Sequence, residues 1–126
     1  MKSILVIDDD PQIRQLLEEV LRIEGYDVVG AESVQKGLPD FPRSKVPLIV
    51  TDVLMPDREG LETIRELRKN NPNMKIIAIS GGLEEGGIDV LDIAKRFGAD
   101  RVLRKPFEVK EFLSMVREIL NKMNGV

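Results

Sequence analysis

The sequence has no cysteine, no histidine and no tryptophan among its 126 residues, and only one tyrosine. Without cysteine it can form no disulfide, and it offers no thiol nucleophile and no cysteine ligand for zinc or an iron–sulfur cluster. Without histidine it lacks a Ser-His-Asp triad, an imidazole base and histidine metal ligands. A metal site in this chain must therefore use oxygen ligands, which suit a hard cation such as Mg²⁺ or Ca²⁺.

Long apolar runs and an excess of basic residues are also missing. No stretch reaches the ~18 apolar residues from which a transmembrane helix would be predicted. The first apolar segment turns acidic at Asp8, too early for a signal peptide. The 19 basic residues are outnumbered by 22 acidic ones, and the net charge of −3 argues against direct nucleic acid binding. We therefore expect a cytoplasmic protein that contacts neither membrane nor nucleic acid.

Short apolar segments alternate with amphipathic helical patterns along the whole chain. Apolar runs rich in β-branched residues predict strands at residues 4–7, 27–30, 48–51, 75–79 and 101–103. Apolar residues at helical spacing predict helices at about residues 11–24, 61–70, 88–97 and 109–123. These alternations predict one α/β domain over residues 1–126, with a doubly wound, five-stranded parallel sheet and helices on both faces.

Individual residues predict where the first helix begins and ends, and others predict that the second helix is short or irregular. Asp10 followed by Pro11 predicts a helix cap and a first helical residue, and Gly25 predicts the end of that helix. The segment at residues 33–47 is interrupted by Gly37 and three prolines. Any helix there is expected to be short, about residues 33–38, or distorted.

Polar side chains follow four of the predicted strands. They are Asp8, Asp9 and Asp10 after the first strand, Asp52 after the third, Ser80 after the fourth and Lys105 after the fifth. In an open α/β sheet the ligand site lies beyond the carboxyl ends of the strands. If the strands at residues 4–7 and 48–51 are neighbours, their aspartates face one pocket, which Ser80 and Lys105 can reach.

Aspartates that share a pocket need a reason to be there. Two carboxylates about 4 Å apart repel by roughly 4 kcal/mol at an effective dielectric constant of 20, against a total stability of ~5–15 kcal/mol for a domain. A bound cation would offset this cost, and Mg²⁺ fits oxygen ligands. A carboxylate beside Mg²⁺, a lysine and a hydroxyl could accept a phosphoryl group as an aspartyl phosphate. Asp10 is better explained as a helix cap.

These residues lie within motifs that occur together in a known family. The motifs are ILVIDDD at residues 4–10, LIVTDVLMPD at 48–57 followed by Gly60, IIAISGG at 76–82, and KPF at 105–107. In this order and spacing, the chain resembles over essentially its whole length the receiver domain of two-component response regulators, such as the bacterial chemotaxis regulator. The resemblance implies a flavodoxin-like sheet with strand order 2-1-3-4-5.

The resemblance also implies roles for the acidic residues. Asp52 would be the phosphoacceptor. Asp9 and Asp52 would bind Mg²⁺ together with the backbone carbonyl of Leu54, and Asp8 would act through a metal-bound water.

The remaining implied roles concern phosphoryl binding and partners. Ser80 and Lys105 would each contact a phosphoryl oxygen, and the peptide bond between Lys105 and Pro106 would be cis, as is common in the family. The donor would be a histidine kinase or a phosphorelay protein. The chain would catalyse its own phosphorylation and dephosphorylation without being an enzyme for a metabolite. It would then control a downstream effector, or an output domain outside this chain.

One departure from the family concerns signal output. The switch position in the fifth strand, often tyrosine or phenylalanine, is Val102 here. Rotation of an aromatic ring is therefore not expected. Instead, backbone shifts or packing would change the face formed by the helix at 88–97, the strand at 101–103 and the helix at 109–123, together with the loop at 81–87.

Two other functions compete with this interpretation. A haloacid-dehalogenase-like phosphatase needs a second aspartate two residues beyond its nucleophile. That position is Leu54 after Asp52, or Asp10 after Asp8, and the latter choice leaves Asp52 without a role. A flavin-binding flavodoxin-like protein is opposed by the acidic site and by the lack of a Ser/Thr/Gly-rich phosphate cradle after the first strand. Hydrolysis of small phosphate esters and a visible absorption spectrum would distinguish these alternatives.

Overall fold

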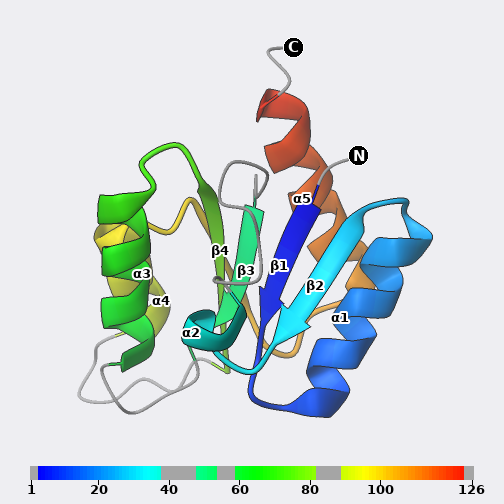
Figure 1. Ribbon diagram of the computed structural model, residues 1–126, viewed down its shortest axis with the longest axis horizontal. Coiled ribbons are helices and arrows are strands. Elements are labelled where there is room, and N and C mark those ends of the chain that lie inside the picture. The colour runs from blue at the N-terminus through cyan, green and yellow to red at the C-terminus, as the bar shows by residue number, and fades with distance from the viewer. Residues whose placement is uncertain (1–2, 38–47, 54–58, 82–88, 124–126) are drawn as a thin grey trace.

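The centre of the structure is a parallel sheet with the strand order β2-β1-β3-β4-β5 (Figure 1). The strands are β1 (Ser3–Ile7), β2 (Asp27–Ala31), β3 (Leu48–Asp52), β4 (Lys75–Ser80) and β5 (Arg101–Arg104). The computed structural model describes residues 3–37, 48–53, 59–81 and 89–123. The predicted five-stranded, doubly wound sheet and its flavodoxin-like order are both confirmed.

The three central strands are apolar because both of their faces are covered. Along β1, Ile4 and Val6 pack into one cluster of buried residues, while Leu5 and Ile7 pack into a second cluster on the opposite face. All four side chains are buried. This is the continuous apolar pattern of a strand in a parallel sheet covered on both sides.

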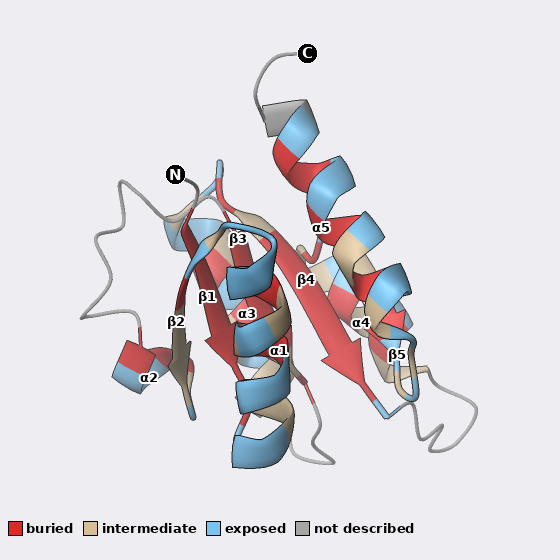
Figure 2. Cartoon of the chain, turned by 90° about the vertical axis from the view of Figure 1, so that its right-hand side faces the viewer, coloured by how far each residue is buried: buried red, intermediate tan, exposed pale blue. Residues whose placement is uncertain are grey.

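The helices divide into two layers, one on each face of the sheet. Helices α1 (Pro11–Ile23) and α5 (Val109–Met123) cover the face of the first cluster, through residues such as Leu17 and Phe112. Helices α2 (Val34–Gly37), α3 (Glu59–Asn70) and α4 (Val90–Phe97) cover the other face, through residues such as Ile64 and Leu91. In Figure 2 the buried residues of α5 lie on one side of the helix and the exposed residues on the other.

The predicted limits of α1 agree with the structure to within one residue, whereas α3 begins two residues earlier than predicted. The Asp10 side chain caps α1 by accepting a hydrogen bond from the Gln12 amide, and Pro11 is the first helical residue. Gly25, just beyond the last helical residue, has a φ of 97°, which favours glycine. Helix α2 is short, as its sequence predicts. The proline-containing segment at 38–47 lies outside the described residues, as does Ile88, which was expected in α4.

Two further features bear on the expectations from sequence. Val102 on β5 is partly buried against the second cluster, on the face of the sheet that α4 covers. In the part of the chain that the structure describes, no helix combines the length and the apolar character needed to cross a membrane.

Candidate functional site

The strand order brings the polar residues of four strand ends to one edge of the sheet. Strands β1 and β3 are neighbours, and Ile7 pairs with Thr51 in their register. The next residue along each chain segment, Asp8 and Asp52 respectively, therefore lies beside the other. The ladder continues beyond the strands through hydrogen bonds from the Val53 amide to the Ile79 carbonyl and from the Lys105 amide to the Ser80 carbonyl, both 2.8 Å. The site therefore lies at the ends of hydrogen-bonded strands.

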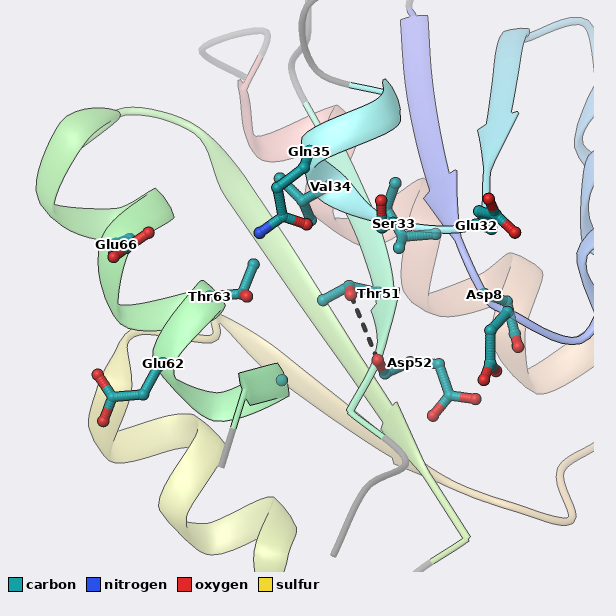
Figure 3. Close-up of a pocket in the computed structure, with 13 residues that line it drawn as sticks. Asp8, Glu32, Ser33, Val34, Gln35, Thr51, Asp52, Glu62, Thr63 and Glu66 are labelled. Carbon is teal, nitrogen blue, oxygen red and sulfur yellow. Dashed lines mark hydrogen bonds between the residues drawn. The ribbon is translucent and has the colours of Figure 1, made fainter. Parts of the chain in front are cut away.

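Three carboxylates form the centre of this edge. Asp8, Asp9 and Asp52 each place a carboxylate oxygen within 4.8 Å of the other two. The side chains of Asp8 and Asp52 are only 2% and 4% exposed, whereas Asp9 is exposed. Figure 3 shows the carboxylates of Asp8 and Asp52 reaching into the same space from β1 and β3. The acidic cluster predicted from the sequence is thus present.

Lys105 supplies positive charge directly to this cluster. Its Nζ atom lies 2.8 Å from Oδ2 of Asp52 and 3.6 Å from Oδ2 of Asp8. Burial acts to lower the pKa of Lys105, but the hydrogen bond and charge of Asp52, together with Asp8, outweigh it and raise the pKa above 10.5. The ammonium group is therefore held in its charged form between two buried carboxylates. The position of Lys105 at this edge was predicted from the sequence, but its ion pair with Asp52 and Asp8 was not.

The turn between β1 and α1 is fixed by hydrogen bonds around Asp8. The Asp10 amide donates to Oδ1 of Asp8, and the Arg14 guanidinium donates to the Asp8 carbonyl, each at 2.9 Å. Because the carboxylate of Asp10 caps α1, it serves the helix rather than the cluster, as predicted. Arg14 was missed from the sequence, since an arginine in the second turn of a helix carries no distinctive signal.

The other predicted site residues are placed as follows. Ser80 is buried at the end of β4 and pairs with Arg104 in the sheet register. The peptide bond between Lys105 and Pro106 is cis. Leu54, predicted to offer a backbone carbonyl to the metal, lies outside the described residues, as do residues 82–88 of the loop expected to move.

A pocket of about 530 Å³ opens from the carboxylate cluster toward α2 and α3 (Figure 3). Besides the three aspartates, its lining includes Glu32, Glu62 and Glu66. The described residues that line it include no lysine or arginine, although Lys105 reaches the aspartates and Lys36 pairs with Glu32. The pocket is strongly acidic.

The donor set fits a hard divalent cation. The cluster carries three carboxylates, while the nearby Lys105 contributes one positive charge. Oxygen ligands of this kind suit Mg²⁺, which binds through a few carboxylates and keeps several waters. Asp9, the exposed member, can face both a cation and solvent.

Comparison with known proteins gives a consistent picture. The model of the response regulator receiver domain family matches residues 4–117. The Escherichia coli (strain K12) transcriptional regulatory protein CpxR is 33% identical over 122 residues, which cover 97% of this chain and 50% of CpxR. The chain spans about half the length of the curated relatives it matches.

Solved structures of receiver domain proteins share this fold. A CheY-like receiver domain protein from Methanospirillum hungatei JF-1 superimposes with a TM-score of 0.85, at 29% identity and with 99% and 98% of the two chains covered. TrrA from Thermotoga maritima, solved in complex with Mg²⁺ and BeF, has a TM-score of 0.76, 33% identity and coverage of 94% and 99%. With the acidic strand-end cluster and this match over most of its length, the chain belongs to the response regulator receiver domain family of two-component signalling.

Proposed function

We propose that this chain is a phosphorylation-controlled switch in which Asp52 accepts a phosphoryl group from a histidine kinase or a phosphorelay protein. The observation that carries the proposal is the contact between Asp52, its carboxylate neighbours and Lys105. Asp52 lies within 4.8 Å of the Asp8 and Asp9 carboxylates and 2.8 Å from the lysine ammonium. The family match favours this proposal over the phosphatase and flavodoxin alternatives.

The proposed transfer needs a nucleophile and a means of binding the transferred oxygens. A carboxylate oxygen of Asp52 attacks the phosphorus of a phosphohistidine, the phosphorus–nitrogen bond breaks, and its electron pair returns to the imidazole. Lys105, which lies beside Asp52, would pair with one phosphoryl oxygen. The hydroxyl of Ser80, at the end of the adjacent strand, would donate to another. Attack by water on phosphorus later breaks the bond to Asp52 and releases phosphate.

The proposal includes a Mg²⁺ site. Asp9, Asp52 and the carbonyl of Leu54 would hold the ion, and Asp8 would contact one of its waters. When bound, Mg²⁺ offsets the negative charge of the carboxylates and of the phosphoryl group. Asp8 is kept in place for this role by the Asp10 amide and, through its carbonyl, by Arg14. The structure of TrrA in complex with Mg²⁺ and BeF supports the choice of metal.

The proposed output is a change in the face formed by α4, β5 and α5. Ser80 is the last residue of β4, and Lys105 directly follows the last residue of β5. The two residues proposed to contact the phosphoryl oxygens are therefore joined through the backbone to strands next to this face. CpxR is named a transcriptional regulatory protein, and the match covers 50% of it. We therefore propose a downstream effector or an output domain as the target, with no nucleic acid contact by this chain, and a cytoplasmic location.

The test is phosphorylation with a small phosphodonor. The protein is incubated with acetyl phosphate and Mg²⁺, and an acid-stable, base-labile acyl phosphate is sought by mass spectrometry. Asp52→Asn should abolish it. Asp10→Asn is the matched control, because asparagine also caps helices and Asp10 serves α1. Incorporation at the wild-type level in Asp52→Asn would contradict the proposal.

A further inference from the structure

The first turn of α4 is capped by Asp89. Its side-chain Oδ1 accepts a hydrogen bond from the Leu91 amide at 3.0 Å. Its backbone carbonyl accepts from the amides of Asp92 at 3.0 Å and Ile93 at 3.3 Å. The amides at the start of a helix have no preceding helical turn to supply carbonyl acceptors, so they depend on the capping residue. Whatever holds Asp89 in place therefore also holds the amino-terminal end of α4.

The second carboxylate oxygen of Asp89 pairs with Arg104 on β5. Nη2 of Arg104 contacts Oδ2 of Asp89, whose side chain is 20% exposed against 46% for the arginine. Figure 2 shows α4 and β5 next to each other. Arg104 is opposite Ser80 in the sheet register and directly precedes Lys105. The pair thus ties the start of α4 to the backbone between the two groups proposed to bind phosphoryl oxygens.

The other end of α4 is held differently. Arg68 of α3 donates from Nε and Nη2 to the Gly98 carbonyl, at 3.0 and 2.9 Å, and also binds Asp100 and the Met74 carbonyl. These bonds fix the carboxyl-terminal end of α4 to α3 and to the start of β5. A displacement at the carboxyl end of β5 can therefore reach the first turn of α4 through Arg104, while the last turn stays anchored.

We propose that the ion pair between Arg104 and Asp89 is the link that carries the state of the phosphoacceptor site to helix α4. The inference rests on the proposed function of Asp52. Phosphorylation adds roughly two negative charges at this edge, and Lys105 and Ser80 adjust to them. The Arg104 guanidinium then shifts relative to Asp89, and the first turn of α4 is released or moved. Coupling is reciprocal, so the pair also changes how strongly the site binds a phosphoryl mimic.

Two variants break the link from opposite sides. Asp89→Asn keeps a side-chain oxygen that caps the Leu91 amide but removes the charge that pairs with Arg104. Arg104→Met keeps an unbranched stem and removes the guanidinium. The matched control is Arg101→Met, because Arg101 is also on β5 and forms a 2.8 Å ion pair with Glu118 of α5 that does not involve α4.

Amide hydrogen exchange, measured with and without beryllofluoride and Mg²⁺, tests the proposed role of the Arg104–Asp89 pair directly. In both variants without ligand, we expect the amides of Leu91, Asp92 and Ile93 to exchange up to about fivefold faster, the range of a partly exposed ion pair. The amides of Gly98 and Ala99 should stay as in the wild type. Beryllofluoride should change the exchange rates of the first-turn amides of α4 in the wild type and in Arg101→Met. The change should be clearly smaller in Asp89→Asn and Arg104→Met.

The double variant sharpens the result. If the two residues act through one contact, the first-turn amides of α4 should exchange no faster in the double variant Asp89→Asn/Arg104→Met than in either single variant. Additive effects, or link variants whose first turn responds to beryllofluoride as fully as the wild type, would overturn the proposal.

A separate measurement tests the underlying function. Beryllofluoride with Mg²⁺ should raise the melting temperature of the wild type but not of Asp52→Asn. If this rise is missing, the phosphoacceptor proposal fails and the link fails with it. If the rise is present while the variants behave as the wild type, the link alone is wrong.

Discussion

The Nζ atom of Lys105 lies 2.8 Å from Oδ2 of Asp52, although the two residues are 53 positions apart in the sequence. This ammonium also lies 3.6 Å from Asp8, so one cation bridges two carboxylates that are almost fully buried. Part of the repulsion within the acidic cluster is thus already offset by a residue of the chain. Asp9 is the exposed member of the cluster and is not in this bridge. The three aspartates are therefore not equivalent, and their variants should differ.

Asp9→Asn and Asp52→Asn should change stability unequally when Mg²⁺ is chelated. Asp9→Asn removes repulsion without breaking the Lys105 bridge, and should raise the free energy of unfolding by up to about 1 kcal/mol. Asp52→Asn removes repulsion but also breaks the 2.8 Å pair, so its gain should be smaller or negative. Urea denaturation with EDTA measures both. A larger gain for Asp52→Asn would mean that the bridge contributes little.

Added Mg²⁺ should stabilise the wild type by mass action. At a free concentration 100 times the dissociation constant, the expected gain is about 2.7 kcal/mol. Asp9→Asn and Asp52→Asn should gain much less, because each removes one proposed ligand. Asp10→Asn should respond as the wild type does, since the Asp10 carboxylate caps α1. Thermal melts over a Mg²⁺ titration measure these gains, and equal gains in all four proteins would place the metal elsewhere.

Stability should fall at alkaline pH because the pKa of Lys105 is raised in the folded state. Burial lowers this pKa, but Asp52 and Asp8 raise it more, so the folded protein holds the proton more tightly than the unfolded chain. A group with a raised pKa contributes stability below its unfolded value, here 10.5, and loses it as the pH rises through the folded value. Lys105→Met should be less stable at neutral pH and decline less steeply above about pH 10.

A second group titrates in the same range and needs its own control. The pKa of Tyr26 is raised from 10.0 by burial and by the charge of Glu24, with Arg117 opposing. A raised pKa again makes stability fall with rising pH. Comparing unfolding free energies of wild type, Lys105→Met and Tyr26→Phe between pH 8 and 11, with EDTA present, separates the two contributions. If Lys105→Met shows the full wild-type decline, the lysine is not responsible.

Local signals predicted most of the fold and the acidic centre of the site. Apolar runs such as residues 4–7 predicted strands because both faces of the sheet are covered. Asp10 and Gly25 marked the limits of α1 because capping and positive φ depend on neighbouring residues alone. Asp8 and Asp52 could be placed together because parallel strands end at the same edge.

The contacts that were missed join side chains far apart in the sequence. Arg68 reaches Gly98 and Asp100, and Arg104 reaches Asp89, only because α3, α4 and β5 pack together. No local pattern distinguishes these arginines from the solvated ones on the same elements. Their partners depend on helix positions relative to the sheet, which hydrophobic periodicity does not specify.

Arg68→Met should destabilise the protein more than Arg65→Met, although both residues are on α3. The guanidinium of Arg68 binds the carbonyls of Gly98 and Met74 and the carboxylate of Asp100, with its side chain only 25% exposed. Replacing it leaves several acceptors without this donor, at an expected cost of about 2 kcal/mol. Arg65 is exposed and lies over the Phe97 ring at 5.3 Å from its centroid, a contact that contributes about 1 kcal/mol or less. Urea denaturation compares the two variants. Equal losses would show that Arg68 acts as an ordinary surface arginine and that α4 is anchored by its apolar contacts, Leu91 and Ala94, instead.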